Sequence, residues 1–217
     1  MRTLMNFKSI SKLSLLGGLL ILAGCQSILD ENTQVSQPQV QIPHNDPQWQ
    51  NHLKQLEQIK RYSARGQFGY ISKEPKERFS SNFDWSYQSA NQFGLEFTSN
   101  LSSKSLKLQR TARGLTVSDN KGNSRTEADI NSLMEEIVGL AFPIDQFGDW
   151  LKGLPKNNDQ YIVNEQRQLA QFTYPINGQL WQATYVEYHA GQPALPKLIQ
   201  LENGNQTLKI RVDEWKY

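Results

Sequence analysis

Apolar and polar side chains alternate along residues 78–97, and this period of two constrains the fold more than any other feature of the sequence. One face is polar, and the other carries large apolar side chains: Phe79, Phe83, Trp85, Tyr87, Phe93, Leu95 and Phe97. Such alternation is typical of antiparallel strands that bury one face and leave the other in water. The sequence therefore predicts a sheet with one aromatic face.

Alternation returns farther along the chain, at residues 106–108, 115–117 and 181–185. Asn177-Gly178 and Asn203-Gly204 are predicted to be two-residue hairpin turns, because asparagine and glycine tolerate the positive φ angles that such turns need. Altogether the pattern predicts about eleven strands.

Three stretches have helical spacing instead. Asp46-Pro47 supplies an N-cap and a first-turn proline ahead of apolar residues that recur at helical intervals up to Tyr62. Residues 126–129 resemble a capping box, with Asp in place of Glu, before a second helix. Pro143 starts a third, short helix.

This order of a helix, strands, further helices and more strands excludes a repeating βαβ arrangement. The expected fold class is mainly β with helices (α+β), as a curved antiparallel sheet of about eleven strands that forms an incomplete β-barrel. We expect the helices to plug its opening.

The N-terminal segment has the organisation of a bacterial lipoprotein signal peptide. A basic stretch precedes an apolar run at residues 13–22, which is shorter than the ~20 residues of a spanning helix. The run ends in the lipobox Leu22-Ala23-Gly24-Cys25. We expect residues 1–24 to be removed and Cys25 to be lipidated. An ordinary signal peptide beside an incidental cysteine is the alternative.

Gln26 follows the cysteine, where an aspartate would resemble a signal for retention in the inner membrane. Its absence favours the outer membrane. Residues 25–46 are rich in Gln, Asn, Ser and Pro, so we expect a lipidated N-terminus and a flexible tether. Residues 47–217 form one folded domain in this interpretation.

Charge argues against nucleic-acid binding. The signal peptide holds three basic side chains, Arg2, Lys8 and Lys12, and no acidic one, so the formal net charge of +2 becomes −1 without it. A near-neutral exported domain lacks the basic footprint of nucleic-acid-binding proteins.

The sequence shows no recognisable catalytic or metal site. Cys25 is the only cysteine, and His44, His52 and His189 lack metal-binding spacing. No GxSxG, Walker or GxGxxG motif occurs. We expect no metal, no cofactor and no enzymatic activity.

Aromatic residues are abundant, with five Trp, eight Tyr and nine Phe. Taken singly, each is most simply a core residue. As a set they favour a ligand cavity, because a curved sheet too wide for its side chains to fill leaves a space suited to acyl chains. The candidate cavity residues are Phe79, Phe83, Trp85, Phe93, Leu95, Phe97, Leu133, Ile137 and Trp181.

Leu101 is a lone leucine among small polar residues, between the strands expected to end at Phe97 and begin at Leu106. Isolated exposed leucines are common, but on a tethered protein an apolar loop tip can enter lipid. The charged side chains in residues 101–126 are basic except for Asp119, and those in residues 127–149 are all acidic. This asymmetry is either ordinary solvated surface or a means to steer a charged partner or face anionic head groups.

Several motifs resemble those of the LolB family of outer-membrane lipoproteins, and together they span almost the whole chain. Besides the lipobox they are Trp49-x-x-His52, Tyr62 with Arg65-Gly66-x-Phe68-x-Tyr70-Ile71-Ser72, Asp119-Asn120-Lys121-Gly122, Trp150-Leu151-x-Gly153-Leu154-Pro155 and Pro193-Ala194-Leu195-Pro196.

The resemblance implies an incomplete barrel with a helical lid over a hydrophobic cavity, and no nucleotide hydrolysis. It implies a monomeric receptor, facing the periplasm, that accepts lipoproteins from the carrier LolA, binds their acyl chains and inserts them into outer-membrane lipid. Leu101 matches the family's membrane-inserting leucine. A structural lipoprotein that scaffolds another outer-membrane complex, or a lipid-anchored envelope hydrolase, are the alternatives.

Overall fold

The structure is a computed structural model that describes residues 28–29, 40–99, 105–129, 144–155, 160–176 and 178–217. The helices are α1 (Pro47–Gln58) and α3 (Ile144–Leu151). The strands are β1 (Tyr62–Ser72), β2 (Glu77–Ser89), β3 (Gln92–Thr98), β4 (Ser105–Thr111), β5 (Gly114–Asp119), β6 (Ser124–Glu127), β7 (Tyr161–Val163), β8 (Leu169–Ile176), β9 (Gln179–Tyr188), β10 (Pro196–Glu202) and β11 (Gln206–Lys216).

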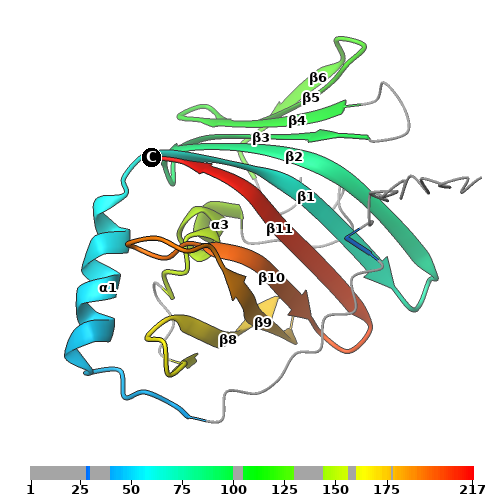
Figure 1. Cartoon of the computed structure of the whole chain (residues 1–217). Helices are drawn as coiled ribbons and strands as arrows, with labels where there is room; N and C mark the ends of the chain where they lie inside the picture. Colours follow the sequence, from blue (N-terminus) through cyan, green and yellow to red (C-terminus); the bar gives the residue numbers. More distant parts are fainter. Residues whose placement is uncertain (1–27, 30–39, 100–104, 130–143, 156–159, 177) are drawn as a thin grey trace, which may run out of the picture.

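The eleven strands form one antiparallel sheet in the order β6-β5-β4-β3-β2-β1-β11-β10-β9-β8-β7 (Figure 1). Strands β1 and β11 are neighbours, so the first and last strands of the domain join two meanders into one curved surface. Strands β6 and β7 remain the two edges of the described sheet, and the barrel is incomplete. The predicted fold class is confirmed.

The register follows the alternation predicted from the sequence. On β2, Phe83, Trp85 and Tyr87 are buried, while the intervening side chains face solvent. Strand β1 bends at a bulge between Arg65 and Gly66, where the backbone of β11 comes so close that a Cβ on Gly66 would clash with it. Bulges of this kind increase curvature.

Helix α1 begins as predicted. The Asp46 carboxylate accepts hydrogen bonds from the backbone N–H groups of Gln48 (3.0 Å) and Trp49 (2.9 Å), and Pro47 occupies the first turn. The helix ends at Gln58, earlier than the apolar spacing suggested. Tyr62 instead starts β1, because its alternation with the residues that follow fits a strand.

Two local predictions were wrong. Thr126 of the predicted capping box belongs to β6, where its hydroxyl lies 2.7 Å from that of Thr116 on β5. Asn203-Gly204 is part of a three-residue connection between Glu202 and Gln206, because the Asn203 side chain accepts hydrogen bonds from the backbone N–H groups of Asn205 (3.1 Å) and Gln206 (2.7 Å). The positions expected for the second helix, residues 130–138, lie outside the described residues.

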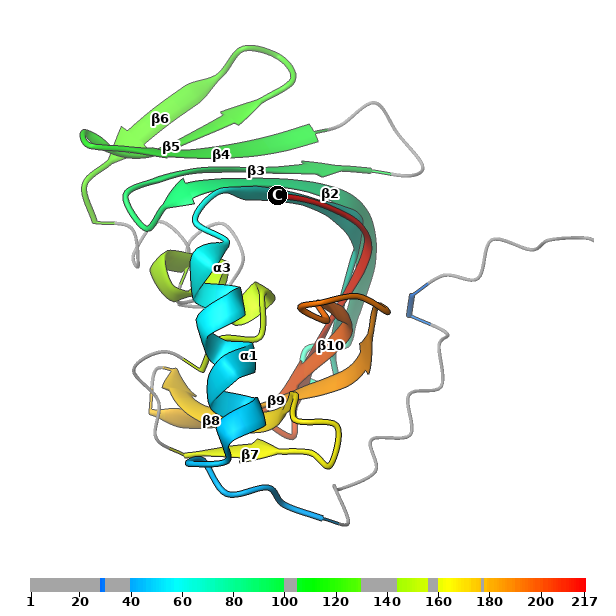
Figure 2. The same cartoon turned by 60° about the vertical axis from the view of Figure 1, so that its left-hand side comes forward.

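Helices α1 and α3 lie on the concave side of the sheet (Figure 2). Phe147 of α3 meets Trp85 edge-on, with ring centroids 5.1 Å apart. The Tyr62 hydroxyl donates a hydrogen bond to the carbonyl of Gly148 (2.6 Å), and the Tyr185 hydroxyl donates one to the carbonyl of Trp150 (2.6 Å). These contacts fix α3 against both halves of the sheet.

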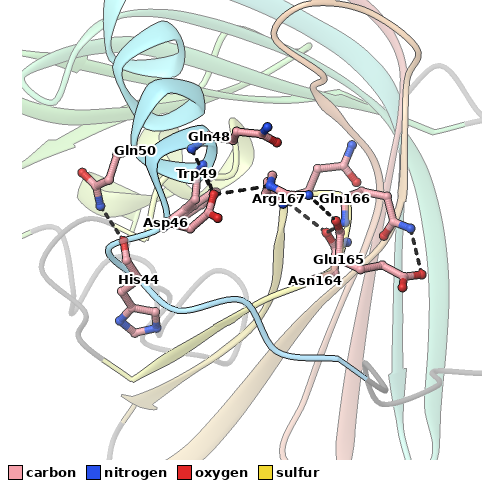
Figure 3. A network of polar contacts seen from close by, with 10 residues as sticks. His44, Asp46, Gln48, Trp49, Gln50, Asn164, Glu165, Gln166 and Arg167 are labelled. Carbon is pink, nitrogen blue, oxygen red and sulfur yellow. Dashed lines mark hydrogen bonds and ion pairs between the residues drawn. The ribbon is translucent and has the colours of Figure 1, made fainter.

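The residues just before α1 are part of the domain. The Ile42 N–H donates to the carbonyl of Val163 on β7 (3.0 Å), and the His44 ring stacks on Tyr161 at 3.8 Å. Asp46 also lies 3.4 Å from the guanidinium of Arg167 in the β7–β8 turn (Figure 3). The end of the expected tether is therefore held against β7.

Candidate functional site

An aromatic patch occupies the concave face near the β1–β2 turn. It consists of Phe68, Tyr70, Phe79 and Phe97, whose neighbouring ring centroids are 5.2–6.1 Å apart. Phe79 is 45% exposed, and Phe68 and Phe97 are half-buried, although all face the inside of the curve. The patch is thus an accessible apolar surface inside the incomplete barrel.

Small residues make room for this patch. Ser81 lies opposite Phe68, and Gly66 lies opposite Phe83, so the sheet has no bulky side chain at two positions between the rings. The Ser81 hydroxyl is buried and has no hydrogen-bond partner in the structure.

Most of the described cavity candidates belong to a closed core. Their exposures are between 1% and 5%: Phe83, Trp85, Phe93, Leu95 and Trp181. They pack in one cluster with the buried faces of α1 and α3. In this structure they are covered by protein and offer no surface to a ligand.

Four predicted residues lie outside the described residues: Cys25, Leu101, Leu133 and Ile137. The structure therefore brings together Phe79 and Phe97 from the predicted set. It adds Phe68 and Tyr70, which belong to a family motif in the sequence but were not predicted as cavity residues. Their period-two spacing was visible, but the glycines on either side of Phe68 made that strand look less apolar.

Titratable groups beside α3 act as structural partners. Burial raises the pKa of Tyr62 well above its ordinary value, and burial followed by the nearby Asp149 charge raises the pKa of Tyr87 to about 12. Both phenols therefore stay protonated near neutral pH. Lys152 is 3% exposed and donates to the carbonyl of Ile59 (3.1 Å), with Asp149 at 3.5 Å.

The described residues contain no cluster of three or more potential metal ligands. A cavity of about 630 Å³ lies between α1, the β2–β3 end of the sheet and Lys152, away from the aromatic patch. Its lining mixes charged and apolar side chains and includes none of the predicted cavity residues. No described helix has the length and apolar character needed to cross a bilayer.

The incomplete antiparallel barrel with helices inside its curve is a fold shared with a solved protein structure. A LolA superfamily protein from Nitrosomonas europaea superposes with a TM-score of 0.51 at 9% identity, covering 77% of this chain and 92% of that one. At this identity the likeness concerns the fold alone.

The chain belongs to the LolB family. The family model described as "Outer membrane lipoprotein LolB" matches residues 60–215. The chain is 64% identical to the outer-membrane lipoprotein LolB of Actinobacillus pleuropneumoniae serotype 3 (strain JL03) and 62% identical to that of Glaesserella parasuis serovar 5 (strain SH0165). Each match covers 97% of this chain and 100% of the relative.

Proposed function

We propose that this protein is the outer-membrane receptor that accepts lipoproteins from a LolA-type periplasmic carrier and inserts them into the outer membrane. Family membership supports this function. The observation that carries it is the exposure of Phe79 inside the barrel, within a patch of aromatic rings. Such a surface suits the acyl chains of the cargo.

The transfer requires no catalysis by this chain. Each acyl methylene that leaves water contributes about 0.8 kcal/mol, so even partial cover of an acyl chain gives substantial binding. A difference of about 1.4 kcal/mol between carrier and receptor favours the receptor tenfold. The bilayer, which covers the acyl chains completely, is the final acceptor.

The anchoring and delivery residues in this proposal are Cys25 and Leu101. The Cys25 thiol takes the lipid that holds the domain, as a monomer, on the periplasmic face of the outer membrane. Leu101 enters the bilayer during release of the cargo. Leu133 and Ile137 remain candidate contacts of the acyl chains in this proposal.

Photo-crosslinking tests the acyl-binding step. Benzoylphenylalanine is placed at Phe79 or Phe97 in a version that starts at residue 40, and the protein is mixed with carrier loaded with a lipoprotein. We expect covalent adducts with the acylated cargo. The control position is Asn82, which is exposed on the opposite face of the same strand. Absence of adducts at Phe79, or equal yields at Asn82, would refute binding at the patch.

Leu101→Glu tests the delivery step. Its carboxylate must be desolvated to enter lipid and is repelled by anionic head groups. We expect the variant to accept cargo from the carrier and to fail to deliver it to liposomes, with unchanged unfolding. Delivery at the wild-type rate would exclude an insertion role for Leu101.

A further inference from the structure

Two residues close to the lipidated cysteine dock on the outside of the sheet. Ile28 is fully buried, and a Cβ on Gly69 would lie 3.0 Å from its Cγ2 atom and 2.8 Å from Cδ2 of Leu29. Phe68 and Tyr70 face the concave side, so Gly69 faces the convex side. Residues 28–29 lie outside the curve of the sheet in Figure 2. The missing side chain of Gly69 leaves room for them.

The convex face beside Gly69 is shielded from water. A row of residues in register crosses the sheet from Gly69 through Lys209, Gln200, Thr184 and Gln171. Three of these polar side chains are only 6–8% exposed: Lys209, Thr184 and Gln171. Ile42 pairs with β7, the strand after the end of this row. The described parts of the N-terminal segment therefore meet the sheet near both ends of a buried row.

The short spacing between Cys25 and Ile28 limits how far from Gly69 the lipid can lie. Cys25 is three residues from Ile28, and three residues span at most about 10 Å. Gly69 is three residues from Ser72 and seven from Tyr62, which corresponds to about 10 Å and about 23 Å along the strand. With Ile28 docked, the anchor reaches the β1–β2 end of the sheet and falls short of the opposite end.

The end that the anchor reaches also exposes apolar side chains. Leu180 is 63% exposed beside the β8–β9 turn, which the register places at the same end as the β1–β2 turn. Phe79 of the aromatic patch lies near the start of β2, also at this end. A bilayer facing this end would cover Leu180 and meet the open side of the patch.

We propose that docking of Ile28 and Leu29 at Gly69 orients the protein, so that the end of the sheet with the β1–β2 and β8–β9 turns faces the lipid bilayer. This inference rests on the proposed lipidation of Cys25. The N-terminal segment is then a positioning strap in addition to a tether. It shortens the path from the aromatic patch to the membrane and makes Leu180 a lipid contact.

Fluorescence quenching in liposomes tests this orientation. The full lipidated protein is reconstituted in phosphatidylethanolamine and phosphatidylglycerol vesicles that contain lipids spin-labelled at the head group. Because lipidation consumes the only cysteine, a thiol introduced as Leu180→Cys is the single labelling site. Arg113→Cys, in the β4–β5 turn at the other end, is the matched position. We expect loss of emission at position 180 and retained emission at position 113.

Displacing the strap should abolish this difference. Gly69→Val introduces a side chain where Ile28 and Leu29 dock, and valine suits a strand. The control is Gly94→Val on β3, where a Cβ would meet the Ser86 side chain and not the strap. Ile28→Ser combined with Leu29→Ser releases the strap without changing the sheet. We expect Gly69→Val and the double variant to equalise quenching at the two positions, and Gly94→Val to preserve the difference.

Equal quenching of the two positions in the otherwise unchanged protein would overturn the proposed orientation. So would a difference that persists in both Gly69→Val and the Ile28→Ser, Leu29→Ser variant. Transfer of cargo from a loaded carrier, measured on the same samples, separates the two proposals. Normal transfer with equal quenching refutes the orientation alone, whereas absent transfer in every sample refutes the receptor function.

Discussion

At the residue scale, Phe79 and Trp85 show how different two positions on one face of one strand can be. Both point to the concave side of β2, yet Phe79 is 45% exposed and Trp85 is 1% exposed. Trp85 also donates a hydrogen bond to the Tyr62 hydroxyl (3.0 Å). Phe79 is free to contact a ligand, while Trp85 stabilises the core.

Substitution by alanine should separate these roles. Phe79→Ala should weaken acyl-chain binding and lower the free energy of unfolding by less than about 1 kcal/mol, because its ring is half in water. Trp85→Ala should cost about 3–5 kcal/mol, because it leaves a cavity in the core. Binding of a fluorescent fatty acid and denaturant unfolding measure the two effects. A Phe79→Ala variant with full binding would remove Phe79 from the site.

His52 should make stability depend on pH near neutrality. Burial lowers the pKa of His52, and its Nε2 atom is buried without a hydrogen-bond partner in the structure. The unfolded chain therefore binds a proton more readily than the folded one. This contribution to stability is fully present above the unfolded pKa of about 6.5 and is lost as the pH falls from there through the lower pKa of the folded state.

We expect the free energy of unfolding to decrease between about pH 7.5 and about pH 5.5, and His52→Leu to reduce this dependence. The lowered pKa of Asp46 comes first from its hydrogen bond with the Trp49 N–H and affects stability at lower pH, so the two effects are separable. An identical pH dependence in the variant would show that His52 does not contribute.

Alternation in the sequence predicted which way the side chains on β2 and β3 point, because the face of a strand is a local property. It did not predict which of them are covered. That depends on tertiary packing: Phe147 of α3 packs against Trp85, whereas Phe79 remains 45% exposed. Phe68 and Tyr70 were not predicted as cavity residues, since their ring contacts with Phe97 and Phe79 form only when β1, β2 and β3 lie side by side.

At the scale of elements, α1 is held by its N-cap and by β7. Asp46 caps two backbone N–H groups and also pairs with Arg167. The sequence predicted the start of this helix because capping is local. The capping box predicted at residues 126–129 was wrong, because Thr126 lies in a strand and pairs with Thr116 of the neighbouring strand.

Two substitutions of Asp46 should distinguish capping from charge pairing. Asp46→Ala should lower the free energy of unfolding by about 1 kcal/mol, because the first turn loses its acceptor. Asp46→Asn keeps a good cap and removes only the partly exposed ion pair with Arg167, so its cost should be much smaller. Urea unfolding measures both. Equal costs for the two variants would show that the ion pair dominates.

At the scale of the whole molecule, the number of strands and the incomplete barrel could be predicted, whereas the limits of the domain could not. Polar composition suggested a free tether up to residue 46. Ile42 and His44 nevertheless bind β7. Ile42 donates a backbone hydrogen bond, and the His44 ring stacks on Tyr161 and lies within hydrogen-bond distance (2.8 Å) of the Tyr161 carbonyl. Such contacts depend on a partner more than a hundred residues away, which local composition does not reveal.

A version that starts at residue 40 should therefore be more stable than one that starts at Asn45. The shorter version loses the Ile42 hydrogen bond, the His44 stack and the hydrogen bond between the His44 ring and the Tyr161 carbonyl, which are worth about 2 kcal/mol together. Both versions should unfold cooperatively, because the sheet and helices lie beyond residue 46. Equal midpoints in urea would show that residues 40–44 add nothing to the domain.

Transfer of a lipoprotein between purified proteins tests directly whether this chain is a lipoprotein receptor. A LolA-type carrier loaded with a radiolabelled lipoprotein is mixed with residues 40–217 of this chain, without nucleotide, and the two proteins are separated. We expect intact cargo to move to this protein, and Phe79→Asp, which places a charge in the aromatic patch, to leave it on the carrier. Cargo that stays on the carrier in the presence of the folded wild-type domain, or that is cleaved by it, would contradict the proposed receptor function.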